Sequence, residues 1–74
     1  MESFVAYLEA YFGRDNALSQ REVARRAQIS YVYLNKILHS KAVPTLPIAE
    51  RIAAATGSSL GSILRNPKKV ALAS

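Results

Sequence analysis

The sequence predicts an all-α protein, a compact arrangement of five short helices. Along most of the chain, apolar residues recur at intervals of three and four, which is the spacing of one face of a helix. A serine or threonine precedes each of these runs, as is common for residues that cap the first turn of a helix. Alternation of apolar and polar residues, the pattern of a strand, is suggested only by the segment KKVALAS at the end.

The first predicted helix covers residues 3–12, with Ser3 as its cap and Gly13 as its stop. A chain of this length buries only about 60% of the surface that it exposes when unfolded, so its core must be small. We expect the apolar face of the first helix to belong to that core, and this face comprises Phe4, Val5, Leu8, Tyr11 and Phe12.

The second and third predicted helices follow each other closely. Ser19 and Glu22 form a capping-box pair that opens a helix running to Ala27. Ser30 then caps a helix over residues 31–38, so that a very short turn joins the two. Two short helices with such a connection must cross steeply, which is helix-turn-helix geometry.

Two further helices complete the predicted fold. Thr45 caps one that Gly57 ends, and Ser59 caps a short final helix. We therefore expect a helix-turn-helix domain over residues 1–65 and a C-terminal tail over residues 66–74.

The charge of the chain points to a polyanionic partner. Its formal net charge is +5 and its isoelectric point is near 10.0. The charge concentrates at the tight corner, because residues 19–41 carry Glu22 alone against Arg21, Arg25, Arg26, Lys36 and Lys41. A basic patch of this kind attracts nucleic acids.

The composition argues against an enzyme, a metalloprotein and a membrane protein. With no cysteine and one histidine, the chain offers no nucleophile–base pair, no thiolate metal site and no zinc-binding helix, and it has no glycine-rich phosphate loop. We therefore expect no catalytic residue, no metal and no cofactor. No apolar run approaches the ~20 residues of a membrane span, so we expect a cytoplasmic protein.

The helix-turn-helix stretch resembles the DNA-binding domains of the phage Cro and repressor family, also called XRE-like or lambda-repressor-like domains. Within the motif the matching residues are Gln20, Val23, Ala24, Ala27, Ile29, Ser30, Leu34 and Ile37. The match continues through Lys41, Pro44, ERIAAATG at 50–57 and SLGSIL at 59–64, so the resemblance covers residues 3–64. It implies a lambda-repressor-like fold that binds DNA through the second helix of the motif.

Two positions depart from the family, which usually has glycine where this chain has Gln28 and Ser40. A left-handed backbone at Gln28 would cost a residue other than glycine roughly 1–2 kcal/mol. The second departure affects the loop that follows the motif, where Ser40 precedes the basic Lys41.

Helical geometry sorts the residues of the third predicted helix. At ~100° per residue, a Leu34 that faces the core places Val32 and Lys36 on the opposite side. A recognition helix inserts its N-terminal part into the major groove, where Asn pairs with adenine, Lys donates to guanine and Val packs on a thymine methyl group. The predicted base-reading residues are therefore Tyr31, Val32, Asn35 and Lys36.

A second set of residues is expected to contact phosphates or to support the recognition helix. These residues are Gln20, to which the resemblance gives this role, and Arg21, Ser30, Tyr33, His39 and Lys41. Other interpretations stay open for some residues of both sets. Tyr31 and Tyr33 could instead cover the small core, and His39 could simply be exposed. Arg25 and Arg26 are expected to form a solvated face that steers the encounter with DNA.

Together these features predict a sequence-specific DNA-binding transcriptional regulator, and the resemblance makes it a dimeric Cro-like repressor of a phage or mobile element. One helix reads too few base pairs to single out one site in a genome, so we expect a homodimer on an inverted-repeat operator in double-stranded DNA. The candidate dimer residues, some of which will belong to the core, are Leu60, Ile63, Leu64, Val70 and Leu72. The alternative is a disordered tail and a dimer that forms only on DNA.

The alternative is an antitoxin whose main partner is a toxin protein, because the same fold would serve it equally well. A toxin-like gene next to this one would favour the antitoxin, and a divergently transcribed regulator gene would favour the repressor.

Overall fold

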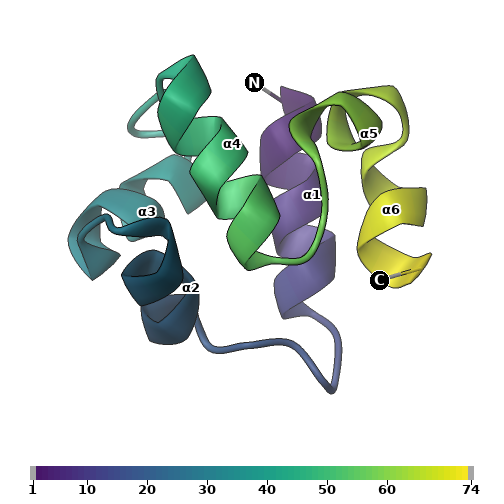
Figure 1. Cartoon of the computed structure of the whole chain (residues 1–74), viewed down its shortest axis with the longest axis horizontal. Helices are drawn as coiled ribbons and strands as arrows, with labels where there is room; N and C mark the ends of the chain where they lie inside the picture. Colours follow the sequence, from purple (N-terminus) through teal and green to yellow (C-terminus); the bar gives the residue numbers. More distant parts are fainter. Residues whose placement is uncertain (1, 74) are drawn as a thin grey trace.

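The computed structural model describes residues 2–73 and places them in six helices, with no strand among these residues (Figure 1). The helices are α1 (Glu2–Phe12), α2 (Gln20–Ala27), α3 (Tyr31–Leu38), α4 (Leu46–Ala55), α5 (Leu60–Arg65) and α6 (Pro67–Ala73). The all-α prediction is confirmed, and the first five helices lie where the sequence predicts them. Within the described range, no helix is long and apolar enough to cross a membrane.

Polar side chains cap four of the helices as predicted. Each accepts a hydrogen bond of 3.0–3.4 Å from the backbone N–H three residues further on, and these caps are Ser19, Ser30, Thr45 and Ser59. Such a bond satisfies one of the N–H groups that the first turn of a helix leaves without a partner. The predicted cap Ser3 is wrong, because α1 already begins at Glu2 and Ser3 lies inside its first turn.

The tail predicted over residues 66–74 forms a helix, α6, and this corrects the number of helices from five to six. Pro67 takes the first helical position, where a missing N–H costs nothing. α6 packs against α1, and Ala71 is fully buried in the core. Arg14 secures this packing, since its Nη1 donates to the carbonyl oxygen of Ala71 at 3.1 Å. Residue 74 of the predicted tail lies outside the described residues.

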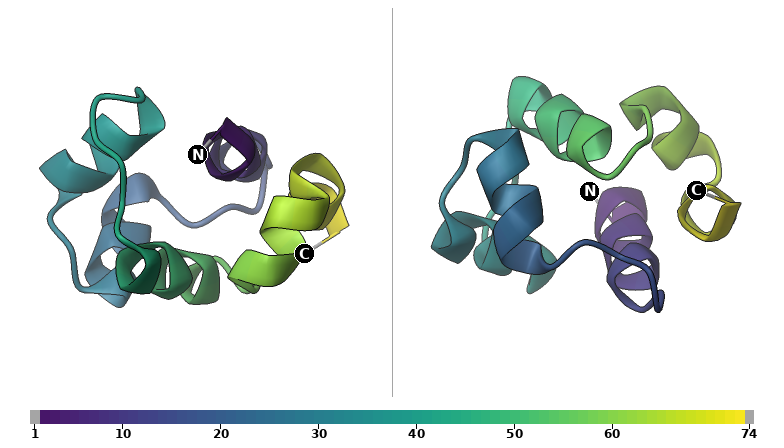
Figure 2. Two further views of the ribbon diagram at one scale, coloured as in Figure 1. Left: turned by 90° about the horizontal axis from the view of Figure 1, so that it is seen from above. Right: turned by 60° about the horizontal axis from the view of Figure 1, so that its bottom comes forward.

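α1 lies at the centre of the molecule, with the pair α2 and α3 on one side and α5 and α6 on the other (Figures 1 and 2). Its buried residues meet those of the other helices in one core, whose largest fully buried members are Phe4, Tyr7, Leu8, Val23, Leu34, Ile37, Ile52 and Ile63.

One buried polar pair lies within this core. The hydroxyl of Tyr7 lies 2.6 Å from Oγ1 of Thr56, and the Thr56 hydroxyl donates in turn to the Ala53 carbonyl at 2.9 Å. Tyr7 therefore donates to Thr56, and neither buried hydroxyl is left without a partner. This pair ties the middle of α1 to the end of α4.

Candidate nucleic-acid interface

The corner between α2 and α3 is short and closed by hydrogen bonds. Gln28 follows α2 with its backbone in the left-handed region, at φ 60° and ψ 42°. Its N–H donates to the Arg25 carbonyl at 3.1 Å, and the N–H of Ile29 donates to the Ala24 carbonyl at 3.0 Å. Glycine usually holds the left-handed position of such a helix end, because it has no Cβ. Gln28, where the resembled family usually has glycine, is therefore a strained residue in a corner whose backbone hydrogen bonds are all of normal length.

The orientation of α3 matches the one predicted from helical geometry. Leu34 and Ile37 are fully buried, whereas Val32, at 61% exposure, and Lys36 lie exposed on the opposite side. The other predicted residues of this helix are half-buried, namely Tyr31, Tyr33 and Asn35. α3 thus presents Val32 and Lys36 on its outer side, with Asn35 beside them and Tyr31 on the flank, and the contact of these residues with bases stays a prediction.

His39 closes the C-terminal end of α3. Its backbone N–H donates to the Asn35 carbonyl at 3.1 Å, and its ring Nδ1 lies 2.8 Å from the same oxygen. Since a carbonyl oxygen only accepts, Nδ1 must carry the proton and donate. The ring is therefore held by a hydrogen bond to the end of α3, and its other nitrogen, Nε2, is the one that could bind another partner.

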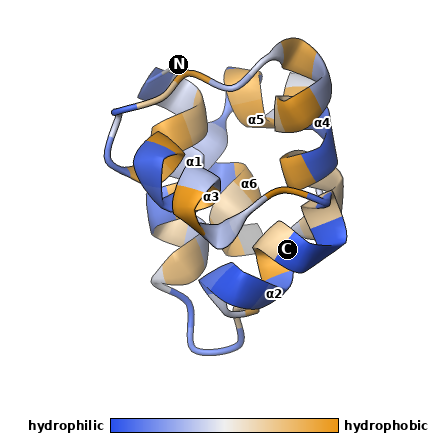
Figure 3. Ribbon diagram, turned by 90° about the vertical axis from the view of Figure 1, so that its left-hand side faces the viewer, coloured by the Kyte–Doolittle hydropathy of each residue, from blue (hydrophilic) through white to orange (hydrophobic). Residues whose placement is uncertain are grey.

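Glu22 organises the basic face of α2, the mostly hydrophilic ribbon in Figure 3. Its carboxylate forms ion pairs with both Arg25 and Arg26, the latter at 2.8 Å. The hydrogen bond from Arg25, followed by that from Arg26, lowers the pKa of Glu22 to about 2, and the same hydrogen bond raises the pKa of Arg25. These pairs were not predicted from the sequence, although a spacing of three and four residues in a helix is the signal for them.

Arg21 makes a different contact from the other two arginines of α2. Its guanidinium carbon lies 4.4 Å from the centre of the Tyr31 ring, which is a cation–π contact between the first turns of α2 and α3. Within residues 2–72 no carboxylate forms an ion pair with Arg21. This contact could not be predicted from the sequence, because no periodic pattern relates residues on two different helices.

The loop from α3 to α4 begins tightly against the end of α3. Ser40 is in the left-handed region at φ 58°, so both positions where the resembled family has glycine are left-handed here. The N–H of Lys41 donates to the Lys36 carbonyl at 2.8 Å. The side chain of Lys41 is exposed.

The comparison with known families decides what this arrangement is. The sequence model of the family described as helix-turn-helix matches residues 14–63, from just after α1 into α5. The chain belongs to the helix-turn-helix family. Its kind is the XRE-like one that the sequence resembled, and such a domain is a DNA-binding regulator of transcription rather than an enzyme. No curated protein and no solved structure gave a significant match.

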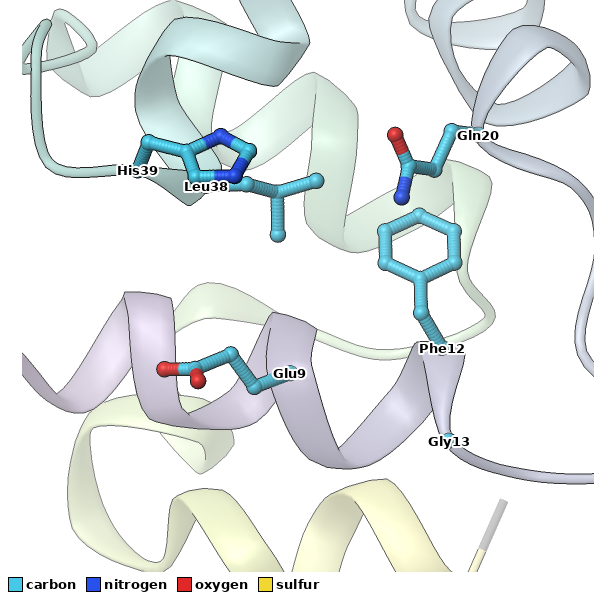
Figure 4. A pocket seen from close by; sticks show the side chains of 6 residues that line it. All are labelled: Glu9, Phe12, Gly13, Gln20, Leu38 and His39. Atoms are coloured by element: carbon cyan, nitrogen blue, oxygen red, sulfur yellow. The ribbon is translucent and has the colours of Figure 1, made fainter.

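In this helix-turn-helix domain, Gln20 lies at the first position of α2 and lines an open hollow of about 410 Å³. The other lining residues come from α1, from α3 and from the residues just after each of these helices, and they are Glu9, Phe12, Gly13, Leu38 and His39 (Figure 4). The amide nitrogen of Gln20 faces the Phe12 ring, and its Oε1 is buried without a hydrogen-bond partner among the described residues. A contact between Gln20 and a phosphate stays a prediction.

The predicted dimer residues of the helix-turn-helix protein fall into two groups. Leu60 and Ile63, at 9% and 0% exposure, belong to the core, as expected for some of this set. Leu64 and Leu72 are exposed to 48% and 69%, and Val70 is half-buried. α5 and α6 lie on the side of α1 away from α3 (Figures 1 and 2). A self-contact through these two helices would therefore leave α3 uncovered.

Proposed function

We propose that the chain is a dimeric, Cro-like repressor of a phage or mobile element, which binds an inverted-repeat operator and blocks a promoter in the cytoplasm. The observation that carries the proposal is the outer side of α3. There Val32 and Lys36 are exposed and Asn35 lies beside them, directly after a basic helix. This is the side that a recognition helix turns toward the major groove.

Three side chains of this face suit three different base edges. The Asn35 amide would pair with adenine through one donor and one acceptor, Lys36 would donate to guanine, and Val32 would pack on a thymine methyl group. Each good polar pair of this type discriminates against a wrong base by about 1–3 kcal/mol.

Phosphate contacts are proposed on both flanks of this face. The Ser30 hydroxyl oxygen accepts from the Tyr33 N–H at 3.0 Å, which fixes the oxygen and leaves its own hydrogen to donate to a phosphate. Lys41 lies at the other end of α3, exposed, in the loop. The complete proposed set is Gln20, Arg21, Ser30, Tyr33, His39 and Lys41.

The proposed dimer uses Leu64 and Leu72, with Val70 as a partly buried neighbour. Lys68 and Lys69 are exposed on the same helix, α6. A two-fold contact brings the same patch of both copies together, and like charges facing each other repel. The axis should therefore pass close to the two leucines and leave the lysines at the rim.

Point substitutions test this surface better than removal of the tail, since removal would also take Ala71 from the core. Leu72→Ser should weaken self-association, measured by analytical ultracentrifugation, and weaken operator binding in parallel. Leu46→Ser is the matched control, because Leu46 is similarly exposed, at 63%, but lies on α4. Equal effects of the two substitutions would remove α6 from the dimer.

Selection of bound DNA from a random pool tests the function as a whole. We expect an inverted repeat with half-sites about 10 base pairs apart, centre to centre. Asn35→Ala should lose about 1–3 kcal/mol on this operator and relax one base position, whereas Lys41→Ala should weaken all sequences alike. Recovery of no consensus by the wild-type protein would rule out the operator-binding repressor.

A second candidate function is that of an antitoxin, and the exposed Val43 and Leu46 favour it. They lie three positions apart where the loop enters α4, and they are exposed to 74% and 63%. Exposed apolar side chains suit contact with a partner protein. Co-expression with a neighbouring toxin-like gene, where one exists, would test it: a complex that Val43→Ser and Leu46→Ser weaken supports the antitoxin, and no complex rejects it.

A further inference from the structure

The three arginines of α2 are held in two different ways. Arg25 and Arg26 share the carboxylate of Glu22, which offsets one of their two positive charges and uses some of their N–H donors. Arg21 instead lies over the ring of Tyr31, at 4.4 Å, and forms no ion pair with a carboxylate in the described part of the chain. Arg21 is therefore the arginine of this helix whose charge is not offset.

A cation–π contact orients a guanidinium group without consuming its donors. The aromatic ring attracts the flat face of the group, whereas the N–H bonds point outward in the plane of that group. The stack on Tyr31 also restricts the rotamers of Arg21 before any ligand arrives. Less side-chain entropy is then lost when the guanidinium binds an anion.

The same contact changes what Tyr31 can do. One face of its ring is covered by Arg21, and the side chain is half-buried. That face is not available to pack on a base or on a thymine methyl group. The ring nevertheless lies in the first turn of α3, so the guanidinium of Arg21 lies at the N-terminal end of this helix, the end that a recognition helix inserts into the major groove.

We propose that Arg21 and Tyr31 form one phosphate-binding unit, in which Tyr31 is a positioning residue that acts through Arg21. A guanidinium binds a phosphate through two parallel N–H donors in one plane, and a stacked Arg21 keeps this edge open. The ligand is a backbone phosphate at the edge of the major groove, next to the bases that α3 reads. This inference rests on the proposed operator binding and revises the predicted base-reading role of Tyr31.

A double-mutant cycle on DNA binding tests the unit. Tyr31→Leu removes the ring and should weaken binding ~2–5-fold on cognate and unrelated DNA alike. Tyr31→Phe keeps the ring and should bind as the wild type does. Arg21→Ala should reduce the slope of log affinity against log salt by about 0.9, the value for one phosphate. In the Arg21→Ala background, Tyr31→Leu should have no further effect.

Two results would overturn the inference. One is an undiminished effect of Tyr31→Leu in the Arg21→Ala background. The other is a changed base at one position of the sequence that Tyr31→Leu or Arg21→Ala selects, since phosphates carry no sequence information.

The stack can also be measured in the free protein. In the wild type, the ring current of Tyr31 should move the NMR signals of the Arg21 Hδ protons upfield. The shift should persist in Tyr31→Phe and vanish in Tyr31→Leu, and its absence from the wild type would overturn the unit. These outcomes are separate from the proposed function, which fails if the wild-type protein selects no operator. If it does select one and the cycle is additive, the phosphate-binding unit alone is rejected.

Discussion

Replacing Gln28 by glycine is expected to stabilise the protein. Gln28 has φ 60° and ψ 42°, and its side chain is exposed, so its removal loses no buried contact. In this left-handed conformation a Cβ destabilises the fold by about 1–2 kcal/mol, and glycine removes that strain. Glycine also gives the unfolded chain more conformational entropy, which lowers the stability by roughly 0.5–1 kcal/mol. The net gain should be about 0.5–1 kcal/mol, or a rise of about 2–8 °C in Tm for a domain of this size.

Thermal and urea unfolding followed by circular dichroism measure this gain, and two substitutions serve as controls. Gln28→Ala keeps the Cβ and should gain nothing. Gly57→Ala adds a Cβ at φ 82°, where no atom lies within 4 Å of it, so any loss of stability comes from the backbone alone. If Gln28→Gly proved no more stable than Gln28→Ala, the turn would carry no strain and the reasoning would be refuted.

Other contacts give further expected outcomes. The affinity for operator DNA, measured by fluorescence anisotropy, should fall with salt by about 0.9 on log–log axes for each phosphate neutralised, and an affinity independent of salt would contradict phosphate binding. Tyr7→Phe should cost about 0.5–1.5 kcal/mol in urea unfolding, because it removes the buried 2.6 Å hydrogen bond to Thr56; an unchanged midpoint would contradict this. Because the pKa of Glu22 is lowered from 4.5 to about 2, its ion pairs stabilise the fold above pH 4.5 and are lost as the pH falls toward 2. In thermal melts over that window the wild type should therefore lose stability relative to Glu22→Gln, and parallel pH profiles would contradict the ion pairs.

Local signals allowed most of the helices to be predicted from the sequence. Ser19, Ser30, Thr45 and Ser59 each precede a run with helical periodicity, and a cap satisfies the backbone next to it whatever the rest of the chain does. The orientation of α3 was equally predictable, because one inward residue, Leu34, fixes the direction of all others on a regular helix.

α6 could not be predicted in the same way. It is seven residues long, and its fully buried residue is Ala71, whose small side chain adds little to an apolar periodic pattern. Isolated helices of this length are unstable in water, so α6 forms because α1 and Arg14 hold it in place. The sequence of the tail therefore indicated an apolar surface, but it did not indicate that the tail forms a helix that packs against α1.

The same distinction, between features of one helix and features that depend on packing between helices, applies to the candidate site. The exposure of Val32 and Lys36 follows from their place on one helix, whereas the stack of Arg21 on Tyr31 depends on how two helices cross. The sequence separated Arg21, as a phosphate contact, from Arg25 and Arg26, as a solvated face, but it showed no partner for any of the three. Which of them meets a carboxylate and which meets a ring is decided by tertiary structure.

The packing of α6 on α1 also affects the order in which the chain can fold. The hydrogen bond from Arg14 to Ala71 joins residues 57 positions apart, and the Tyr7–Thr56 pair joins residues 49 positions apart, whereas a short turn joins α2 to α3. Closing a long loop costs more chain entropy and is slower, so the local pair is expected to form first. When α2 and α3 have already packed together, the side of α1 that α6 covers is therefore still exposed, and apolar surface exposed in this way during folding is prone to aggregation.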